Sequence, residues 1–354
     1  PPPRRRRGWH LPPKQPITPR GAAPWLRKIH VGPMTSSTAS PLTRAFDALM
    51  SRPYLILVIC NLFWGGNTVA GKMAVGHIDA YSLTILRWVG ALILVLPFAL
   101  RPLRRDWPVI RAKWWLYLLY GAVGFTSFNM LMYLAAYFTS GVNASLEQVA
   151  VNIFVIALNF ALFRLTVKPM QLVGVAITIF GVALIATHGD LGRILKLDVN
   201  LGDALIILAC FVYAAYSIAL RWRPQTNWLS FMVATFVGAI IAAIAYEATV
   251  GPGPAAFIAG LPSIDLEGWL IVAYTIIFPS ILSQMFYVRG VELIGSNRAS
   301  LFVNLIPLFG TVGSVIVLGE ALEGFHLVAG VLVAAGIVLA EWSARRVQTS
   351  AQPG

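Results

Sequence analysis

Polar side chains interrupt an apolar stretch near the start of the chain, NLFWGGNTVAGK, at residues 61–72. Amide and hydroxyl groups of this kind donate and accept hydrogen bonds, and the hydrocarbon of a bilayer offers them no partner. On a helix, Asn61, Trp64 and Thr68 fall on one face, with Asn67 beside them. Either these groups line a polar cavity that binds a small ligand, or they form hydrogen bonds with neighbouring helices.

A second polar stripe appears in a later apolar stretch. Ser145, Gln148, Asn152 and Asn159 fall within about 60° of arc on a helix, whereas Glu147 points about 100° away from them. A stripe of four polar groups is costly in lipid, so it must face protein or water. For each member, cavity lining and hydrogen bonding between helices are equally good interpretations.

Asn304 is a third candidate for a polar cavity. It lies one helical turn before Pro307, within another apolar stretch. Proline removes a backbone donor and commonly marks a kink in a helix. The sequence therefore predicts a kinked helix at this point, with an amide side chain beside the kink.

Arg87 and Glu147 are the clearest ionisable residues inside apolar stretches rather than at their ends. Counted from the predicted outer ends of their helices, Arg87 lies about 10 Å deep and Glu147 about 8 Å deep. Three interpretations follow, in this order. The two residues form a static ion pair between helices, Glu147 is a carboxylate that couples transport to protons, or Arg87 is the counter-charge for a substrate carboxylate.

The composition shows what kind of protein must position these residues. Hydrophobic residues make up 58% of the 354 residues and charged residues only 12%, about half of the share in soluble proteins. Ten apolar runs are long enough to cross a bilayer. We expect spans at 53–72, 80–100, 114–137, 142–163, 169–187, 202–220, 228–250, 268–288, 298–318 and 325–343.

The net charge of +13 does not indicate nucleic-acid binding, because eight of the 27 Lys and Arg residues lie in residues 1–33. This Pro- and Arg-rich stretch cannot build a core. We expect residues 1–52 to form a disordered basic tail, of which residues 1–33 lie outside the native protein if Met34 is the true start. The functional alternative is a cytoplasmic tail that contacts anionic lipid.

The remaining positive charges predict the orientation of the chain in the membrane. If the N-terminus is cytoplasmic, the outer loops carry only Lys72, Arg193 and Lys196. The inner segments then carry fifteen positive residues: Arg44, Arg52, Arg101, Arg104, Arg105, Arg111, Lys113, Arg164, Lys168, Arg221, Arg223, Arg289, Arg298, Arg345 and Arg346. This bias predicts cytoplasmic termini, including a C-terminal tail at 344–354, in a multi-pass protein of the cell membrane, the bacterial inner membrane.

The chain also repeats itself. CNLFWGGNTVAGK aligns with ACFVYAAYSIALR at an offset of 149 residues, which matches Trp64 to Tyr213 and Asn67 to Tyr216. Later segments align at an offset of 155. Each predicted repeat, 53–190 and 202–343, holds five helices, and an odd number requires that the second repeat cross the membrane in the opposite sense. The predicted fold is an all-α polytopic membrane protein with ten transmembrane helices as two inverted five-helix repeats, an architecture typical of secondary transporters.

Particular residues of both repeats resemble the EamA-like family of the drug/metabolite transporter superfamily. The second repeat is similar in Tyr287, Arg289-Gly290, Arg298-Ala299-Ser300, Asn304, Pro307, Leu318-Gly319-Glu320, Gly330 and Gly336, and the first in LFWGGNTVAGK, LTILRW and AAYFTSGVNASL. The resemblance implies a ten-helix basket that moves small metabolites, commonly outward, through a cavity between the repeats. The sequence departs from the family where Asn152 replaces the proline and Arg164-Leu165 replaces Gly-Glu, so we expect a reshaped turn after the fourth helix.

Other chemistry finds no support in the sequence. Histidines and cysteines form no metal-binding spacing, and there is no GK[ST] phosphate loop, so we expect no enzyme, no metal and no cofactor. The predicted function is secondary transport of small organic metabolites, amino acids or related compounds, with a membrane scaffold or sensor as the alternative. The partners would be a small-molecule substrate and the lipid bilayer, with no nucleic acid, in a monomer or homodimer. The predicted substrate-binding residues are Trp64, Asn67, Thr68, Arg87, Gln148, Asn152, Tyr213, Tyr216 and Asn304.

Overall fold

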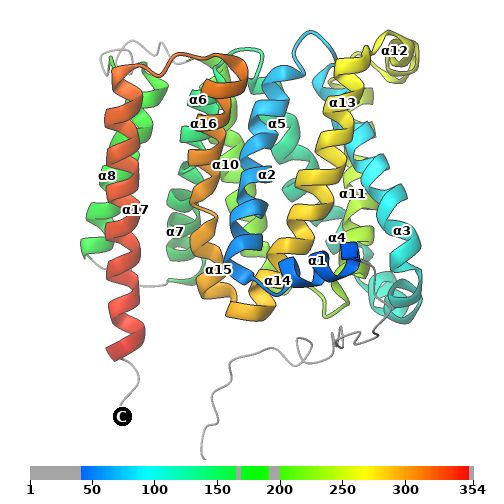
Figure 1. Ribbon diagram of the computed structural model, residues 1–354, viewed down its shortest axis with the longest axis horizontal. Coiled ribbons are helices and arrows are strands. Elements are labelled where there is room, and N and C mark those ends of the chain that lie inside the picture. Colours follow the sequence, from blue (N-terminus) through cyan, green and yellow to red (C-terminus); the bar gives the residue numbers. More distant parts are fainter. Residues whose placement is uncertain (1–40, 165–168, 191–199, 351–354) are drawn as a thin grey trace, which may run out of the picture. The chain divides into compact units, whose positions relative to one another are not determined.

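The computed structural model describes the backbone of residues 41–164, 169–190 and 200–350, and every regular element in these ranges is helical (Figure 1). A short helix, α1 (Pro41–Met50), precedes the first repeat. The first repeat consists of α2 (Pro53–Met73), α3 (Ala80–Ala112), α4 (Trp114–Tyr120), the π-helix η2 (Gly121–Ser127), α5 (Phe128–Ala135), α6 (Gly141–Glu147), α7 (Ala150–Phe163) and α8 (Pro169–Ala186).

The second repeat follows the same order of elements. It consists of α10 (Leu201–Ala219), the short 3-10 helix η3 (Leu220–Trp222), α11 (Trp228–Thr249), α12 (Pro254–Gly260), η4 (Leu261–Ser263), α13 (Leu266–Thr275), the π-helix η5 (Ile276–Leu282), α14 (Ser283–Ile294), α15 (Ser296–Phe302), α16 (Leu305–Leu318) and α17 (Gly324–Ser350). Three short elements have no counterpart in the described part of the first repeat: η3 after α10, and α12 and η4 in the connection before α13.

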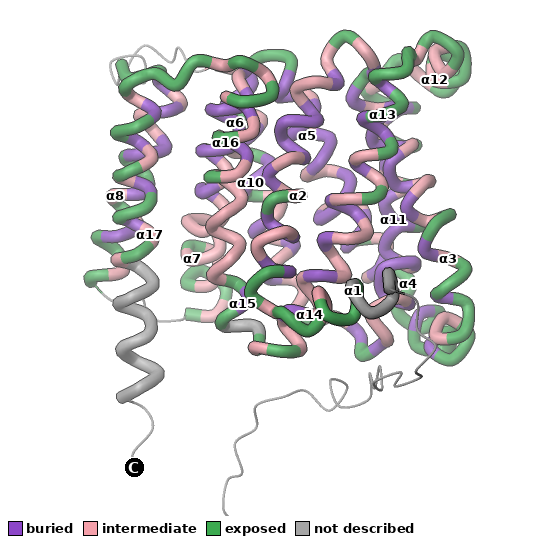
Figure 2. The backbone as a smooth tube through the Cα atoms, in the orientation of Figure 1, coloured by how far each residue is buried: buried purple, intermediate pink, exposed green. Residues whose placement is uncertain are grey.

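The described part of the chain contains nine helical stretches that are long and apolar enough to cross a membrane. They correspond to the first nine predicted spans, and α17, whose apolar part is Gly324–Leu339, corresponds to the tenth. Large apolar side chains such as Phe98, Ile316 and Val331 are more than two-thirds exposed, as expected for side chains that face lipid. Figure 2 shows such exposed positions along the outer faces of α3, α8 and α17. The fold is an all-helical, multi-span membrane protein.

The internal repeat recurs in the bounds of the helices. The two π-helices η2 and η5 begin and end 155 residues apart, and the same offset relates α6 to α15 and α7 to α16. In each repeat the fourth span is broken, at Gln148-Val149 between α6 and α7 and at Val303-Asn304 between α15 and α16. Pro279 inside η5 removes a backbone donor, which favours the altered hydrogen bonding of that π-helix.

Helical structure extends into both predicted tails. The predicted disordered tail at 1–52 contains the helix α1, so the prediction of disorder was wrong there, while residues 1–40 lie outside the described residues. The segment predicted as a C-terminal tail, 344–354, is helical as far as Ser350, and residues 351–354 are not described. The predicted span at 142–163 corresponds to Gly141–Phe163, within which the backbone turns at Gln148-Val149.

The turn after α7 keeps its shape despite its different sequence. Arg164 adopts a left-handed backbone with φ of 53°, and Gly319, 155 residues later, has φ of 67°. A left-handed residue ends many helices and is normally glycine because a side chain is strained there. The expected reshaping is therefore absent at this residue, and Leu165 lies outside the described residues.

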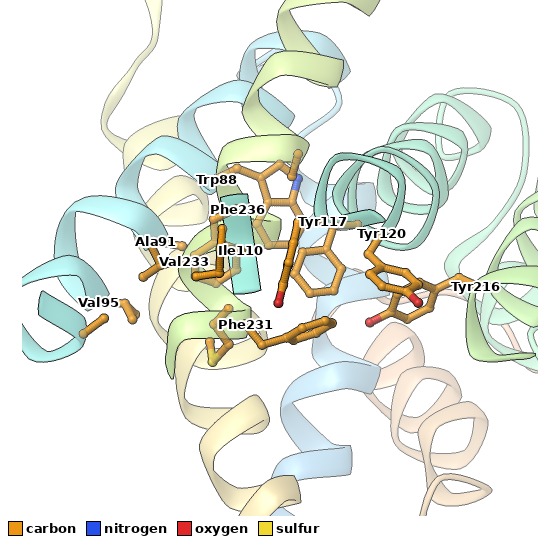
Figure 3. Packing of buried hydrophobic residues seen from close by; sticks show 14 residues of the cluster. Trp88, Ala91, Val95, Ile110, Tyr117, Tyr120, Tyr216, Phe231, Val233 and Phe236 are labelled. Atoms are coloured by element: carbon orange, nitrogen blue, oxygen red, sulfur yellow. The ribbon is translucent and has the colours of Figure 1, made fainter. Parts of the chain in front are cut away.

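Two packing units flank the centre of the bundle. Aromatic residues of α3, α4, η2 and α11 form a buried cluster that includes Trp88, Tyr117, Phe231 and Phe236 (Figure 3). On the other side, α8 and α17 pack against each other along their length, and Figure 1 shows them side by side. The helices between these units carry the polar residues selected from the sequence.

Candidate substrate cavity

A cavity of about 220 Å³ lies between the two repeats. The first repeat lines it from α2, α3, η2, α5 and α7, and the second repeat from α10, η5, α14 and α16. Both π-helices and both breaks in the fourth and ninth spans border this space. Interrupted helices at the interface of repeats are typical of substrate sites in transporters.

Eight of the nine predicted binding residues line this cavity. They are Trp64, Asn67, Arg87, Gln148, Asn152, Tyr213, Tyr216 and Asn304. The structure thus brings together residues from five spans that are far apart in the sequence, and no span contributes more than two of them. Whether they bind substrate remains a proposal, taken up below.

Thr68 lies beside the cavity rather than in its lining. Its hydroxyl accepts a hydrogen bond of 2.9 Å from the Gln148 side-chain amide, and it borders a separate hollow of only about 10 Å³. This bond connects α2 to the break between α6 and α7. Thr68 therefore holds Gln148 in place, and its predicted contact with substrate has no support from its position.

Arg87 is held by four neutral oxygen atoms. Its Nε donates to Ser280 Oγ at 2.7 Å. Its Nη1 donates to Asn67 Oδ1 at 2.9 Å and Asn129 Oδ1 at 2.6 Å, and also to the Tyr133 hydroxyl. The side chain is 4% exposed, so these bonds fix its position at one end of the cavity. A buried guanidinium with neutral partners brings an uncompensated positive charge to this site.

The predicted ion pair between Arg87 and Glu147 does not form. The described hydrogen-bond partners of Arg87 are the neutral oxygens named above, and its guanidinium carbon lies 4.6 Å from the centre of the Trp88 ring. Among the described residues, neither carboxylate oxygen of Glu147 has a hydrogen-bond partner. Glu147 instead lies where α6 packs on α10, with the Cys210 sulfur 3.7 Å from its backbone carbonyl. Equal depth in the membrane did not imply contact, because the two side chains leave their helices in different directions.

Aromatic rings make up much of the remaining wall. Trp64 lies 5.4 Å from Tyr287 between ring centroids, and Phe128 lies 4.9 Å from Tyr213. Trp88 belongs to the wall and also to the aromatic cluster behind it, as Figure 3 shows. The cavity therefore combines one charged end with an apolar, aromatic body.

Sequence analysis missed several cavity residues, including Ser280, Gln284 and Tyr287. The repeat offset could have identified one of them, since Gln284 lies 155 residues after Asn129, whose amide oxygen binds Arg87. Ser280 has Phe125 at the matching position, so no polar pattern in the first repeat indicated it. Among the described residues, no group of His, Cys, Asp or Glu side chains is arranged to hold a metal ion.

Hydrogen bonds connect the helices at the Lys72 end of the bundle. The Lys72 ammonium donates to the Ala136 and Thr139 carbonyls at 2.7 and 2.8 Å. The Glu320 carboxylate accepts from the Gly141 and Val142 amides, each at 2.8 Å, and so joins the end of α16 to the start of α6. At the opposite end the lining extends to Leu220, next to the exposed Arg221.

Comparisons with known proteins agree with this architecture. The chain matches the EamA-like transporter family at residues 51–187 and 200–342. The uncharacterized transporter YyaM of Bacillus subtilis (strain 168) is 25% identical over 291 residues, which cover 81% of this chain and 92% of the relative. A Salmonella typhimurium (strain LT2) protein named probable amino-acid metabolite efflux pump is 24% identical over 291 residues, 81% of this chain and 93% of the relative.

A solved structure supports the fold. A crystal structure with 19% sequence identity superposes with a TM-score of 0.56 and covers 83% of this chain and 98% of its own. At that identity the likeness concerns the fold alone. The two family matches together span most of the chain, and the family is one of transporters rather than of enzymes. This multi-pass membrane protein, with its two EamA domains, belongs to the EamA-like transporter family.

Proposed function

We propose that this chain is a secondary transporter that carries small organic metabolites, amino acids or related compounds, outward across the cell membrane. The cavity between the repeats carries this proposal, because residues of both repeats and both broken helices line it. Its volume of about 220 Å³ suits a small metabolite, since sites for drug-sized ligands usually measure about 300–1,000 Å³. The name of the Salmonella relative supports amino-acid metabolites as the first class to test.

Alternating access between the repeats is the mechanism we propose. In this conformation the Lys72 end is closed by the bonds of Lys72 and Glu320, and the lining reaches toward the Arg221 end. The excess of positive residues favours the Arg221 end as the cytoplasmic side, in the bacterial inner membrane. The substrate would then enter from the cytoplasm and leave after the Lys72 end opens. Reporter fusions after Arg223 and after Pro262 test this orientation, and a signal from the same side for both would contradict it.

The transport test uses the full chain in proteoliposomes and a panel of labelled metabolites. We expect flux of at least one compound, and we expect Asn152→Trp to reduce that flux at least about tenfold because the larger ring fills the cavity. Leu208→Trp is the matched control, since Leu208 lies on α10 with its side chain 48% exposed on the outer surface. Folded protein without flux of any compound would instead favour a scaffold or sensor.

A further inference from the structure

The charge of the cavity restricts what it can bind. Arg87 is the only charged side chain among the described residues that line it. The polar remainder consists of neutral amides and hydroxyls such as Asn129, Gln284 and Ser280. Glu147, the nearest acidic residue on α6, is absent from the lining. No carboxylate of the lining could therefore pair with a positively charged ligand group.

Arg87 keeps one nitrogen available. Among the described residues, all of its hydrogen bonds are donated by Nε and Nη1. The acceptors are oxygen atoms of Ser280, Asn67, Asn129 and Tyr133. Its Nη2 donates to no described protein atom, and the residue borders the cavity. The four acceptors thus fix the plane of the guanidinium, and they leave Nη2 without a partner among the described residues on a side chain that lines the cavity. A fixed donor of this kind loses little conformational entropy when it binds a ligand.

The chemistry of the free nitrogen selects its partner. A guanidinium N–H donates most strongly to an anionic oxygen, and the charge-assisted bond is about twice as strong as one between neutral groups. A buried positive charge without an anionic partner is costly, so a ligand carboxylate would also offset that cost. An ammonium group at the same place would be repelled. The aromatic wall around Trp64, Tyr213 and Tyr287 offers an apolar surface for the rest of the ligand.

We propose that Arg87 forms a carboxylate-binding subsite, and that among amino acids and related compounds the cavity prefers small carboxylates that lack the ammonium group, with a negative net charge and an apolar or aromatic body. This inference rests on the proposed transport function, because it names the substrate class of the same cavity. It differs from recognition of an amine by a carboxylate, which the described lining does not contain. It also differs from a purely structural role of Arg87, in which a carboxylate and its amide would bind with equal affinity.

Binding to the purified full chain in nanodiscs tests the proposal by calorimetry at pH 7. The first probes are 3-phenylpropionate, phenylalanine, 3-phenylpropanamide and 2-phenylethylamine. A second set consists of the straight-chain carboxylates from acetate to octanoate and indole-3-propionate, each with its corresponding amide and amine. We expect a carboxylate to bind about ten- to a hundredfold more tightly than its amide, as one charge-assisted hydrogen bond implies. Equal or tighter binding of the amide or amine overturns the proposal, and so does the absence of binding by every carboxylate.

A variant that leaves Arg87 intact makes the test independent of folding defects at that residue. Gln284→Glu places a carboxylate one helical turn from Ser280, on the helix face that lines the cavity. We expect it to weaken carboxylate binding at least about tenfold while the amide changes less than about threefold. Gln284→Met removes the same amide without adding a charge, so the carboxylate-to-amide preference should be at least about tenfold lower in Gln284→Glu than in Gln284→Met. An unchanged preference in Gln284→Glu overturns the proposal.

Flux measurements separate this inference from the proposed function. Tight carboxylate binding without flux would contradict the transport function and leave the subsite intact. Flux that favours amines or neutral compounds over carboxylates would support transport and contradict the subsite.

Discussion

The side-chain amide of Asn152 donates a hydrogen bond of 3.1 Å to Oδ1 of Asn304, and this bond joins the broken spans of the two repeats. Asn152 lies in the first turn of α7, and Asn304 immediately precedes α16. Both side chains line the cavity, so the repeats meet through polar groups at the proposed substrate site. Because the two amides contact each other directly, their contributions to the free energy of unfolding should be coupled.

A double-mutant cycle tests this bond. We expect Asn152→Ala and Asn304→Ala each to lower the free energy of unfolding by about 1 kcal/mol, and the double variant to lose less than the sum because the bond is removed only once. Asn159→Ala is the control, since Asn159 lies on the same helix and its oxygen accepts from the exposed Arg221. Asn159→Ala and Asn304→Ala should be additive within about 0.5 kcal/mol in denaturation measurements in detergent. Additivity of the first pair would contradict the coupling.

A close approach of α2 and α16 gives a second prediction. A Cβ atom added to Gly65 would lie 2.7 Å from the Gly310 backbone nitrogen and 2.9 Å from the Ile306 carbonyl oxygen. Backbone atoms cannot move aside as a flexible side chain can, so we expect Gly65→Ala to destabilise the protein by about 1–3 kcal/mol.

Gly330→Ala is the matched control for this crossing, because nothing lies within 4 Å of its added Cβ. We expect this variant to be neutral or more stable by up to about 1 kcal/mol, as alanine favours the helix. Thermal unfolding in the same detergent compares the two variants. Equal stability of Gly65→Ala and Gly330→Ala would show that the helices can separate at no cost.

The positions of cavity residues could be predicted from the sequence to the extent that they depend on local periodicity. Trp64 and Asn67 lie on the polar face of one helix. The repeat offset aligns them with Tyr213 and Tyr216 and so predicts that these two residues lie on the matching face of the second repeat. The polar partners of Arg87 could not be predicted in the same way. They come from three other elements, and only the packing of these elements decides which oxygen reaches the guanidinium.

The interrupted helices show a second limit of sequence reasoning. Hydropathy is the same whether a span is straight or broken, so it did not indicate the turn at Gln148, whereas Pro307 indicated a kink close to the turn at Val303. The π-helix that contains Pro279 carried a visible signal, whereas its counterpart at Gly121–Ser127 contains no proline. Matched structural changes in the two repeats therefore arise from different local sequences.

A contact between the repeats at the Lys72 end should respond to pH. His77, in the turn between α2 and α3, lies with its Nδ1 2.7 Å from Asp265 Oδ2 and its Nε2 3.6 Å from Glu267 Oε2. The hydrogen bond to Asp265 raises the pKa of His77 above its ordinary value of 6.5. The Gly268 amide and then His77 lower the pKa of Asp265 from 3.8. Both side chains are therefore charged from the lowered pKa of Asp265 up to the raised pKa of His77.

The sign of the pH effect follows from these directions. The contribution of His77 to stability is fully present below about pH 6.5, its unfolded pKa, and is lost as the pH rises through the higher folded value. We expect an NMR titration of His77 to show a midpoint above 6.5, and Asp265→Asn to lower that midpoint more than Glu267→Gln does. Both partners are largely exposed, so the effect on stability should be small. A midpoint that Asp265→Asn leaves unchanged would contradict the contact.

Glu147 is the remaining ionisable residue that the sequence placed inside a span. It is fully buried, and no described residue forms a hydrogen bond with either of its carboxylate oxygens. Because Arg87 does not pair with it, none of the described side chains compensates a negative charge there. Asp203 on α10 is the nearest acidic group and would repel such a charge. Of the two remaining interpretations of these residues, proton coupling is the one that concerns Glu147.

We expect Glu147→Gln to fold with the same yield as the parent chain, because the amide has the same shape and carries no charge. If Glu147 takes up the coupled proton, the variant should lose the acceleration of flux by an imposed pH gradient, while flux without a gradient persists. Glu247→Gln is the matched control, since Glu247 is equally buried at the far end of α11 and should leave the gradient response unchanged. Proteoliposomes with and without a pH gradient measure the response for the best-transported compound of the panel. A full gradient response in Glu147→Gln would show that Glu147 couples no proton, because glutamine cannot titrate in this range.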